Sequence, residues 1–338
     1  ALTPVYLNLY YRHLDKFNRI KTVFTIHNIA YQGKYGLDIL EDTCGIGARD
    51  AHVVEYDGCA NFMKGAIETA DKVTTVSPTY AQEILDPWFS HGLDGLLRQK
   101  QYKTCGILNG IDVDVFNPAT DPDIAKNYDV DTFQEGKAVC KAALQDEMGL
   151  HKDGSPVMAM VTRLVGHKGV DLVRAIAEGL LQQGIELVIL GSGEAQYENF
   201  FNELCARNPG RVGVYIGFNA KLAQHIYAGA DMFLMPSRSE PCGLAQMVSC
   251  RYGTIPIVRE TGGLRDSIRD SGDGFGNGFT FANYNAHELY EACWRAKEGY
   301  WQKDGWPILV RRAMECDFSW SNSAKSYEGL YNEVVNLW

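Results

Sequence analysis

Short, almost continuously apolar runs alternate with helical segments along most of this 338-residue chain. The runs lie at 22–28, 72–77, 106–111, 157–163, 186–193, 212–217, 232–237 and 254–260. Such runs are typical of strands buried on both faces of a parallel sheet, whereas half-exposed strands alternate apolar and polar residues. The segments 169–184 and 221–230 between them have helical spacing. The alternation predicts a doubly wound α/β fold.

The length of the chain suggests two domains. Segment 116–131 is rich in Pro, Asp and Asn and lacks an apolar period, so we expect the hinge there. Residues 1–118 are then part of one Rossmann-like domain, and 119–317 form a complete second one. The tail 318–338 is predicted to be a helix that packs back on the first domain, with apolar positions at Tyr327, Leu330, Tyr331 and Val334.

The start of the chain predicts an incomplete first domain. Residues 1–13 look like the second half of a crossover helix, and the strand at 22–28 follows directly. A parallel sheet rarely begins in this way, so we expect further residues upstream. A first domain of this kind would carry an open sheet edge and would be unstable.

Charge and cysteine content exclude several classes of protein. The formal net charge of −10 argues against binding to nucleic acid or to anionic membranes. No run of about 18 apolar residues occurs, and the start does not resemble a secretory signal. The nine cysteines are scattered without a C-x-x-C pair, which favours reduced thiols in a cytoplasmic protein and argues against a metal site.

Unusual residues follow several of the predicted strands, at the edge where open α/β sheets bind ligands. They are His27, Asn109-Gly110, Arg163 with Lys168, the segment 191–194, Glu240, and Thr261-Gly262-Gly263. Each has a simpler explanation, such as a core histidine, a glycine that only permits a turn, or cations on a solvated face. The set indicates function because all of its members fall on the same edge.

These residues suit the departure of a nucleotide diphosphate. Arg163 and Lys168 can neutralise a diphosphate without a metal, and stabilising the leaving group is electrostatic catalysis. Gly262 and Gly263 open a predicted helix, so their N–H groups would face an anion, and we expect glycine there because a Cβ would hold the phosphate away. Glu240, expected at the start of a helix, suits sugar hydroxyls or an oxocarbenium-like transition state. No G-x-G-x-x-G motif supports a nicotinamide cofactor.

Six strings resemble those of bacterial glycogen synthases and plant starch synthases, and the resemblance runs from about residue 5 to the final helix. They are TIHNIAYQGKYG, VSPTYAQEI, NGIDVDVFNP, RLVGHKGVDL, SRSEPCGLAQ and RETGGLRDSI. This family consists of retaining glycosyltransferases with two facing Rossmann-like domains, the GT-B fold. The resemblance implies transfer of glucose from ADP-glucose to the non-reducing end of an α-1,4-glucan, with no cofactor or metal.

The resemblance also implies roles for individual residues. Glu240, Arg163, Lys168 and His27 would be catalytic, and His27 would contact the glucosyl group from across the cleft. The donor-binding residues would be Asn109, Gly110, Tyr215, Gly217, Phe218, Cys242, Gly243, Leu244, Thr261, Gly262 and Gly263. Among these, the segment from Tyr215 to Phe218 would lie near the adenine.

The chain departs from the wider family pattern in two places. Many relatives carry a second Glu eight residues after the first, but this chain has Val248 there, which favours the glycogen and starch synthase branch and same-face attack without a protein nucleophile. The K-x-G-G-L loop that closes over the donor does not occur. About a third of a typical member is missing, so we expect this chain alone to be weakly active or inactive.

Alternative functions are a non-catalytic glucan-binding homologue, an inactive fragment, or a retaining transferase with a small acceptor. A non-catalytic homologue would be expected to lose Arg163, Lys168 or Glu240, and all three are present. Small-acceptor enzymes commonly keep the second Glu and an E-P-F-G variant. The sequence alone does not decide between ADP- and UDP-glucose, between glycogen and starch, or between a cytoplasmic and a plastid location. It also does not give the oligomeric state.

Overall fold

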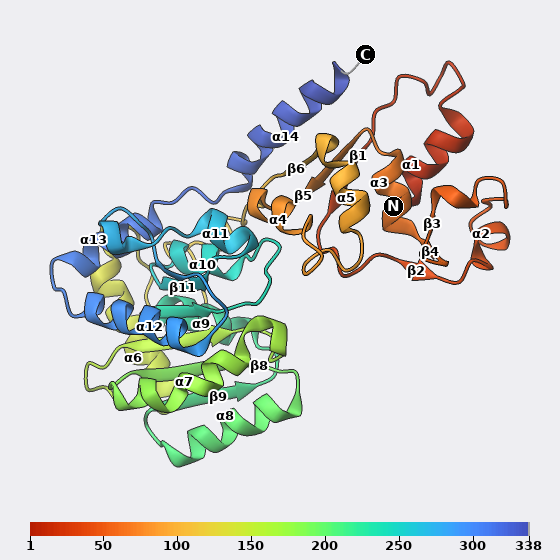
Figure 1. The fold of residues 1–338 in the computed structure, drawn as a ribbon. Coiled ribbons are helices and arrows are strands. Elements are labelled where there is room, and N and C mark those ends of the chain that lie inside the picture. Colours follow the sequence, from red (N-terminus) through yellow and green to blue (C-terminus); the bar gives the residue numbers. More distant parts are fainter. Residues whose placement is uncertain (337–338) are drawn as a thin grey trace. The chain divides into compact units, whose positions relative to one another are not determined.

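The structure is a computed structural model that describes residues 1–336, and the chain divides into two compact units (Figure 1). Unit 1 comprises Ala1–Asn109 and the C-terminal segment from Ser323, and unit 2 comprises Gly110–Asn322. The boundary lies after Asn109 rather than after residue 118 because segment 116–131 is bonded into unit 2. There Tyr128 donates a hydrogen bond to the carbonyl of Tyr252 (2.8 Å), and the hydroxyl of Tyr252 donates to Asp121 (2.6 Å).

Unit 2 is built on a six-stranded sheet with the order β12-β11-β10-β7-β8-β9, in which every pairing is parallel. The strands are β7 (Val157–Val161), β8 (Glu186–Gly191), β9 (Val212–Ile216), β10 (Met232–Met235), β11 (Ile255–Arg259) and β12 (Phe279–Phe281). Five of them lie within predicted runs. β12 was not predicted, because three residues at a sheet edge carry no readable period.

Helices connect these strands, as the alternation predicts. They are α6 (Phe133–Met148), α7 (Val170–Gln182), α8 (Ala195–Arg207), α9 (Ala220–Gly229), α10 (Ala245–Arg251), α11 (Gly262–Ser267), α12 (Ala286–Tyr300) and α13 (Gly305–Met314), with short 3₁₀ turns η4 (Gly166–Lys168) and η5 (Ser271–Asp273). All six residues of β8 are buried, as expected for a strand covered on both faces. Among residues 1–336, no helix combines the length and the apolar character needed to cross a bilayer.

Unit 1 holds a smaller parallel sheet of order β1-β5-β6. Its strands are β1 (Val23–Ile26), β5 (Lys72–Thr75) and β6 (Thr104–Gly106), and its helices include α3 (Phe62–Thr69), α4 (Pro78–Glu83), α5 (Asp94–Gln99) and the 3₁₀ turn η3 (Gln101–Lys103). The final helix, α14 (Trp320–Val335), packs Leu330 and Val334 against Ile107, and Ser323 donates a hydrogen bond to the carbonyl of Leu108 (2.7 Å). From Ser323 onward the helix therefore belongs to the core of unit 1.

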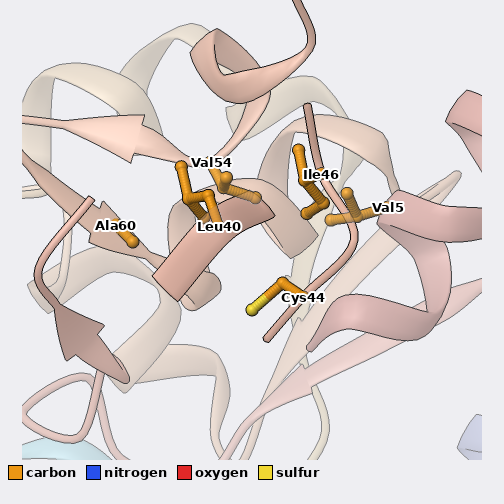
Figure 2. Close-up of a cluster of buried hydrophobic side chains, with 6 residues drawn as sticks. All are labelled: Val5, Leu40, Cys44, Ile46, Val54 and Ala60. Carbon is orange, nitrogen blue, oxygen red and sulfur yellow. The ribbon is translucent and has the colours of Figure 1, made fainter. Parts of the chain in front are cut away.

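A second core of unit 1 lies under a small antiparallel sheet of order β2-β4-β3, which was not predicted. The sheet comprises β2 (Lys34–Tyr35), β3 (Glu55–Tyr56) and β4 (Cys59–Asn61), with α2 (Ile39–Asp42) and η2 (Ala51–Val53) beside it in sequence. Figure 2 shows the buried side chains of this core: Val5, Leu40, Cys44, Ile46, Val54 and Ala60. Val5 comes from α1 (Leu2–Tyr6), which continues as the π-helical η1 (Leu7–Tyr11), so residues 1–13 are largely helical as predicted.

A partly buried ion pair ties the N-terminal helix of unit 1 to the start of β5. Both guanidinium nitrogens of Arg12 donate to Asp71 (2.9 and 2.8 Å), as do the backbone N–H and the hydroxyl of Thr22 (2.8 and 3.0 Å). Burial by itself raises the pKa of Asp71, but these hydrogen bonds outweigh it and lower the pKa to about 2. The folded state thus binds the Asp71 proton less tightly than the unfolded chain, whose aspartates titrate near about 3.9.

We expect Asp71→Asn to lower the free energy of unfolding by about 2 kcal/mol at pH 7. Because the folded pKa is depressed, this stabilisation is present above about pH 4 and is lost as the pH falls toward 2. Urea denaturation of both proteins at pH 7 and pH 3 measures the difference. Asp146→Asn, which removes an exposed ion pair with Lys152, is the control and should change little. A deficit of the same size at both pH values would contradict this account.

Candidate active site

The strand order places the switch point of the unit 2 sheet at the carboxyl ends of β7 and β10. Read from β9, the strands come third, second, first, fourth, fifth and sixth along the chain, which is the order of a Rossmann sheet. The order reverses between β7 and β10, and ligands of open α/β sheets bind at such a switch point. Lys168 follows β7 and Glu240 follows β10, so both predicted catalytic residues lie at this point.

Lys168 and Glu240 form an ion pair across the switch point. Nζ of Lys168 lies 2.6 Å from Oε2 of Glu240, and the hydroxyl of Ser237 donates to the same oxygen (3.0 Å). The two side chains are only 19% and 9% exposed, so water screens the pair weakly. Both of these contacts end on Oε2, which leaves the other edge of the carboxylate to face a ligand.

A glycine allows the loops after β7 and β10 to meet. Lys168 ends the turn η4, and Gly169 follows in the left-handed conformation (φ +75°). A Cβ at Gly169 would lie 2.1 Å from the carbonyl oxygen of Pro236. The N–H of Arg238 also donates to the carbonyl of His167 (2.9 Å). The ion pair is thus built on two loops in direct backbone contact.

Arg163 lies close enough to His167 to affect its pKa, as Lys168 does. Burial lowers the pKa of His167, the positive charges of Lys168 and Arg163 lower it further, and Glu240 and Glu194 act in the opposite direction. Arg163 is exposed, and within residues 1–336 its guanidinium has no hydrogen-bond or ion-pair partner. The two predicted cations therefore act on one imidazole, and Arg163 is the one whose side chain is available to an anion.

Glu240 does not begin a helix, contrary to the sequence prediction. Helix α10 starts at Ala245, and Leu244 occupies the N-cap position. Pro241 and Gly243 (φ +69°) bend the chain before the first turn, so a loop presents the carboxylate. Gln246 holds this loop by donating to the carbonyls of Cys242 (3.1 Å) and Gly243 (2.9 Å).

The glycine pair at the start of α11 is in close contact with the Glu240 loop. A Cβ at Gly262 (φ +45°) would lie 2.0 Å from the carbonyl oxygen of Glu240, and one at Gly263 would lie 2.0 Å from that of Cys242. The N–H of Gly263 already donates to the carbonyl of Glu240 (3.1 Å). Glycine is required here because the Glu240 loop packs on it, a reason that the sequence did not reveal. That these two residues also bind a diphosphate stays a prediction. Thr261 is fully buried beside this contact.

We expect Gly263→Ala to displace the Glu240 loop and to destabilise the protein by about 1–3 kcal/mol, the usual cost of forcing a methyl group into a packed site. Transfer activity should fall with it, because Glu240 moves. Gly305→Ala is the matched control, since its Cβ would have its nearest neighbour at 3.5 Å, an ordinary contact. Melting temperatures and rates of both variants test this, and equal values for the two would refute the packing explanation.

The predicted base-binding residues lie at the carboxyl end of β9, on the same edge of the sheet. Tyr215 is 41% and Phe218 91% exposed, so two aromatic rings are presented to solvent there. Gly217 lies between them with φ +146°, and its N–H donates to the carbonyl of Gly191 (3.0 Å). Of the predicted pocket residues after β10, Cys242 is buried whereas Leu244 is 48% exposed.

His27 and Asn109 belong to unit 1, where each follows the carboxyl end of a strand. His27 is exposed, which rules out the simpler interpretation of a buried core histidine. That these two residues share a site with Glu240 stays a prediction. Gly110 also has a structural explanation, because a Cβ there would lie 2.4 Å from the backbone nitrogen of Trp320. Its predicted contact with the donor stays a prediction.

Three residues near the ion pair were not singled out from the sequence: Ser237, Arg259 and Tyr284. Ser237 ends a predicted strand and contacts Glu240 directly. Arg259 is the charged last residue of an otherwise apolar strand, a signal that could have drawn attention to it. Tyr284 follows β12, which the sequence did not reveal, so no pattern pointed to it.

Comparison with known proteins agrees with this geometry. Residues 1–99 match the family model described as "Starch synthase catalytic domain", and residues 144–300 match "Glycosyl transferases group 1". The chain is 46% identical to a glycogen synthase of Exiguobacterium sibiricum over 99% of this chain and 70% of that protein. It is 47% identical to one of Desulforudis audaxviator over 98% of this chain and 67% of that protein.

Two solved structures have a fold similar to that of this chain. The catalytic domain of starch synthase IV from Arabidopsis thaliana, bound to ADP and acarbose, superposes with a TM-score of 0.89 at 37% identity, covering 98% of this chain and 70% of that one. A sucrose-phosphate synthase from Thermosynechococcus elongatus superposes with a TM-score of 0.58 at 18% identity over 92% of this chain and 67% of that one, which shows the fold alone.

The Rossmann sheet of unit 2 with its charged switch point, the family match over residues 144–300 and the likeness to starch synthase IV define a glycosyltransferase of the GT-B fold. The identity of 46–47% over nearly the whole chain specifies it further: the chain belongs to the glycogen synthase and starch synthase family.

Proposed function

We propose that this enzyme transfers glucose from ADP-glucose to the non-reducing end of an α-1,4-glucan, with retention of configuration and without a metal ion. The main observation that supports the proposal is the ion pair between Lys168 and Glu240 (Nζ to Oε2, 2.6 Å) at the switch point of the unit 2 sheet. Lys168 supplies a positive charge to the leaving group, and Glu240 supplies a negative charge beside the sugar. These charges are opposite in sign to those that glucosyl transfer from a nucleotide diphosphate develops, which are negative on the leaving group and positive on the sugar.

The cations assist the breaking of the bond between the glucose C1 and the diphosphate. The electron pair of that bond passes to the diphosphate oxygen, where negative charge grows in the transition state. Lys168 and the exposed guanidinium of Arg163 stabilise this charge from the β7 loop. In this role they take the place that a divalent cation has in other phosphate chemistry.

Retention follows from attack on the same face that the diphosphate leaves. The acceptor 4-hydroxyl adds to C1, and its proton passes to the departing diphosphate oxygen, so no protein group forms a covalent bond. Position 248, where a second carboxylate would stand on α10, holds Val248, which is buried (3% exposed). Glu240 therefore acts on the positive charge of the oxocarbenium-like sugar or on its hydroxyls.

An adenine donor is supported by two observations. The exposed rings of Tyr215 and Phe218 offer planar surfaces on which a base can stack. The starch synthase IV structure that this chain resembles is described as bound to ADP.

We also propose a cytoplasmic location, which the nine free cysteines support because disulfides are rare in that reducing compartment.

The test is a transfer assay with ADP-glucose or UDP-glucose labelled in the sugar, glycogen as acceptor and EDTA present. The rate of the wild type is compared with that of Glu240→Gln, which gives the baseline. We expect label in the glucan above that baseline, faster from ADP-glucose, and released by an α-1,4-specific glucosidase. No incorporation above the baseline, or a strict requirement for added metal, would overturn the proposal.

A further inference from the structure

Arg259 makes a fork of hydrogen bonds to backbone carbonyls at the carboxyl end of β11. Its Nε donates to the carbonyl of Ser237 (2.9 Å), and its Nη2 donates to that of Arg238 (2.5 Å). Its Nη1 donates to the carbonyl of Ala282 (3.3 Å), just after β12. Three different donors of one planar group thus fix the backbone at the exits of β10 and β12.

The two residues after β10 that Arg259 holds, Ser237 and Arg238, are also the ones that hold the ion pair. Ser237 donates its hydroxyl to Oε2 of Glu240 (3.0 Å). Arg238 donates its backbone N–H to the carbonyl of His167 (2.9 Å), directly before Lys168 in the chain. A shift of the Ser237–Arg238 backbone would therefore move both members of the pair.

The ring of Tyr284 supports this arrangement from the β12 side. The guanidinium carbon of Arg238 lies 4.6 Å from the ring centroid, and that of Arg259 lies 5.9 Å from it. The hydroxyl of Tyr284 lies 2.5 Å from Asp171 and 3.2 Å from the carbonyl of Gly166, in the turn that carries Lys168. The loops after β7, β10 and β12 are thus joined around Arg259.

We propose that Arg259 is a positioning residue for the transfer reaction, which sets the separation of Lys168 and Glu240 without touching the substrate itself. This inference rests on the proposed function, in which that pair is the reacting centre. The planar fork of an arginine is what the role requires. A lysine keeps the charge but cannot donate to three separate carbonyls in fixed directions.

Arg259→Lys tests the proposal through the split between kcat and KM. We expect kcat per folded molecule to fall about tenfold, since a small misplacement of reacting groups slows chemistry strongly, while KM for the donor changes less than about twofold. Arg312→Lys is the matched control, because Arg312 also donates to a backbone carbonyl, that of Gly276 (2.8 Å), away from the ion pair. It should leave kcat unchanged even if it lowers the melting temperature.

A second measurement does not depend on activity. Acylation of lysines by a short pulse of acetic anhydride, read by peptide mass spectrometry and normalised to exposed Lys152, reports how firmly Lys168 is held. We expect Lys168 to be labelled several-fold faster in Arg259→Lys than in the wild type, and at the wild-type rate in Arg312→Lys. Tyr284→Leu, which removes the supporting ring together with its hydroxyl, should raise the rate in the same direction and serves if Arg259→Lys folds poorly.

The outcomes separate this inference from the proposed function. If the wild type transfers no glucose, the proposed function fails, and the labelling rates still decide whether Arg259 holds the pair. If the wild type is active but Arg259→Lys matches the wild type or Arg312→Lys in both kcat and Lys168 labelling, Arg259 is only a structural residue and the inference is overturned.

Discussion

Replacing Glu240 by Gln is expected to reduce glucose transfer by about 10²–10³-fold, the effect of removing one preorganised electrostatic group from a buried site. Glutamine has nearly the same size as glutamate, and its amide oxygen can still accept hydrogen bonds from Lys168 and Ser237. What it removes is the negative charge beside the sugar. We therefore expect the melting temperature to change by only a few degrees, whereas kcat falls by the factor given above.

Glu260→Gln is the matched control for this experiment. Glu260 follows β11 at the same edge of the sheet, is half-buried, and accepts a hydrogen bond from the hydroxyl of Thr280 (2.7 Å). It has no contact with Lys168 among the described residues. Rates measured with labelled donor should be near the wild-type value for Glu260→Gln. Retention of more than a tenth of the activity by Glu240→Gln, or equal losses in both variants, would rule out the catalytic role.

Lys168→Ala has the second largest expected effect. Loss of the ammonium should cost about 2–4 kcal/mol of transition-state stabilisation, or roughly 30- to 900-fold in rate. The structure adds a cost in stability, because Glu240 (9% side-chain exposure) loses its partner and a buried charge left alone is unfavourable. The rate must therefore be expressed per folded molecule, with the folded fraction measured by thermal denaturation of each sample.

Lys221→Ala serves as the comparison for Lys168→Ala. Lys221 is 64% exposed and lies 3.6 Å from Asp123, so its removal deletes a cation of unit 2 without affecting the switch point. We expect it to behave as the wild type. If the loss of rate in Lys168→Ala disappears once the unfolded fraction is subtracted, Lys168 is a structural lysine and its catalytic role is refuted.

Most strands of the six-stranded sheet of unit 2 could be predicted from the sequence because they are long and buried. β8, with all six residues buried, reads as one apolar run, and the same holds for the other inner strands of unit 2. Strands such as β2 and β12 escaped because two or three residues cannot display a period. The domain boundary was misplaced because the irregular composition of segment 116–131 reflects hydrogen bonding into unit 2, not a linker.

The candidate site was predictable as a location but not as a set of contacts. The rule that ligands bind at carboxyl strand ends led to Lys168 and Glu240, which depend only on where β7 and β10 end. Their pairing depends on the approach of two loops far apart in sequence, which no local pattern reveals. The packing role of the glycines at 262 and 263 was missed for the same reason, since a glycine permits close approach of a ligand and of a neighbouring backbone equally well.

Calorimetric titration of the protein with ADP in the presence of EDTA tests the central claim most directly, because it asks whether the cations of unit 2 hold a diphosphate without a metal. We predict binding at a single site for the wild type, binding retained in Glu240→Gln, and a loss of at least tenfold in affinity for Lys168→Ala. Wild-type affinity in Lys168→Ala, or binding that appears only when Mg²⁺ is added, would contradict it.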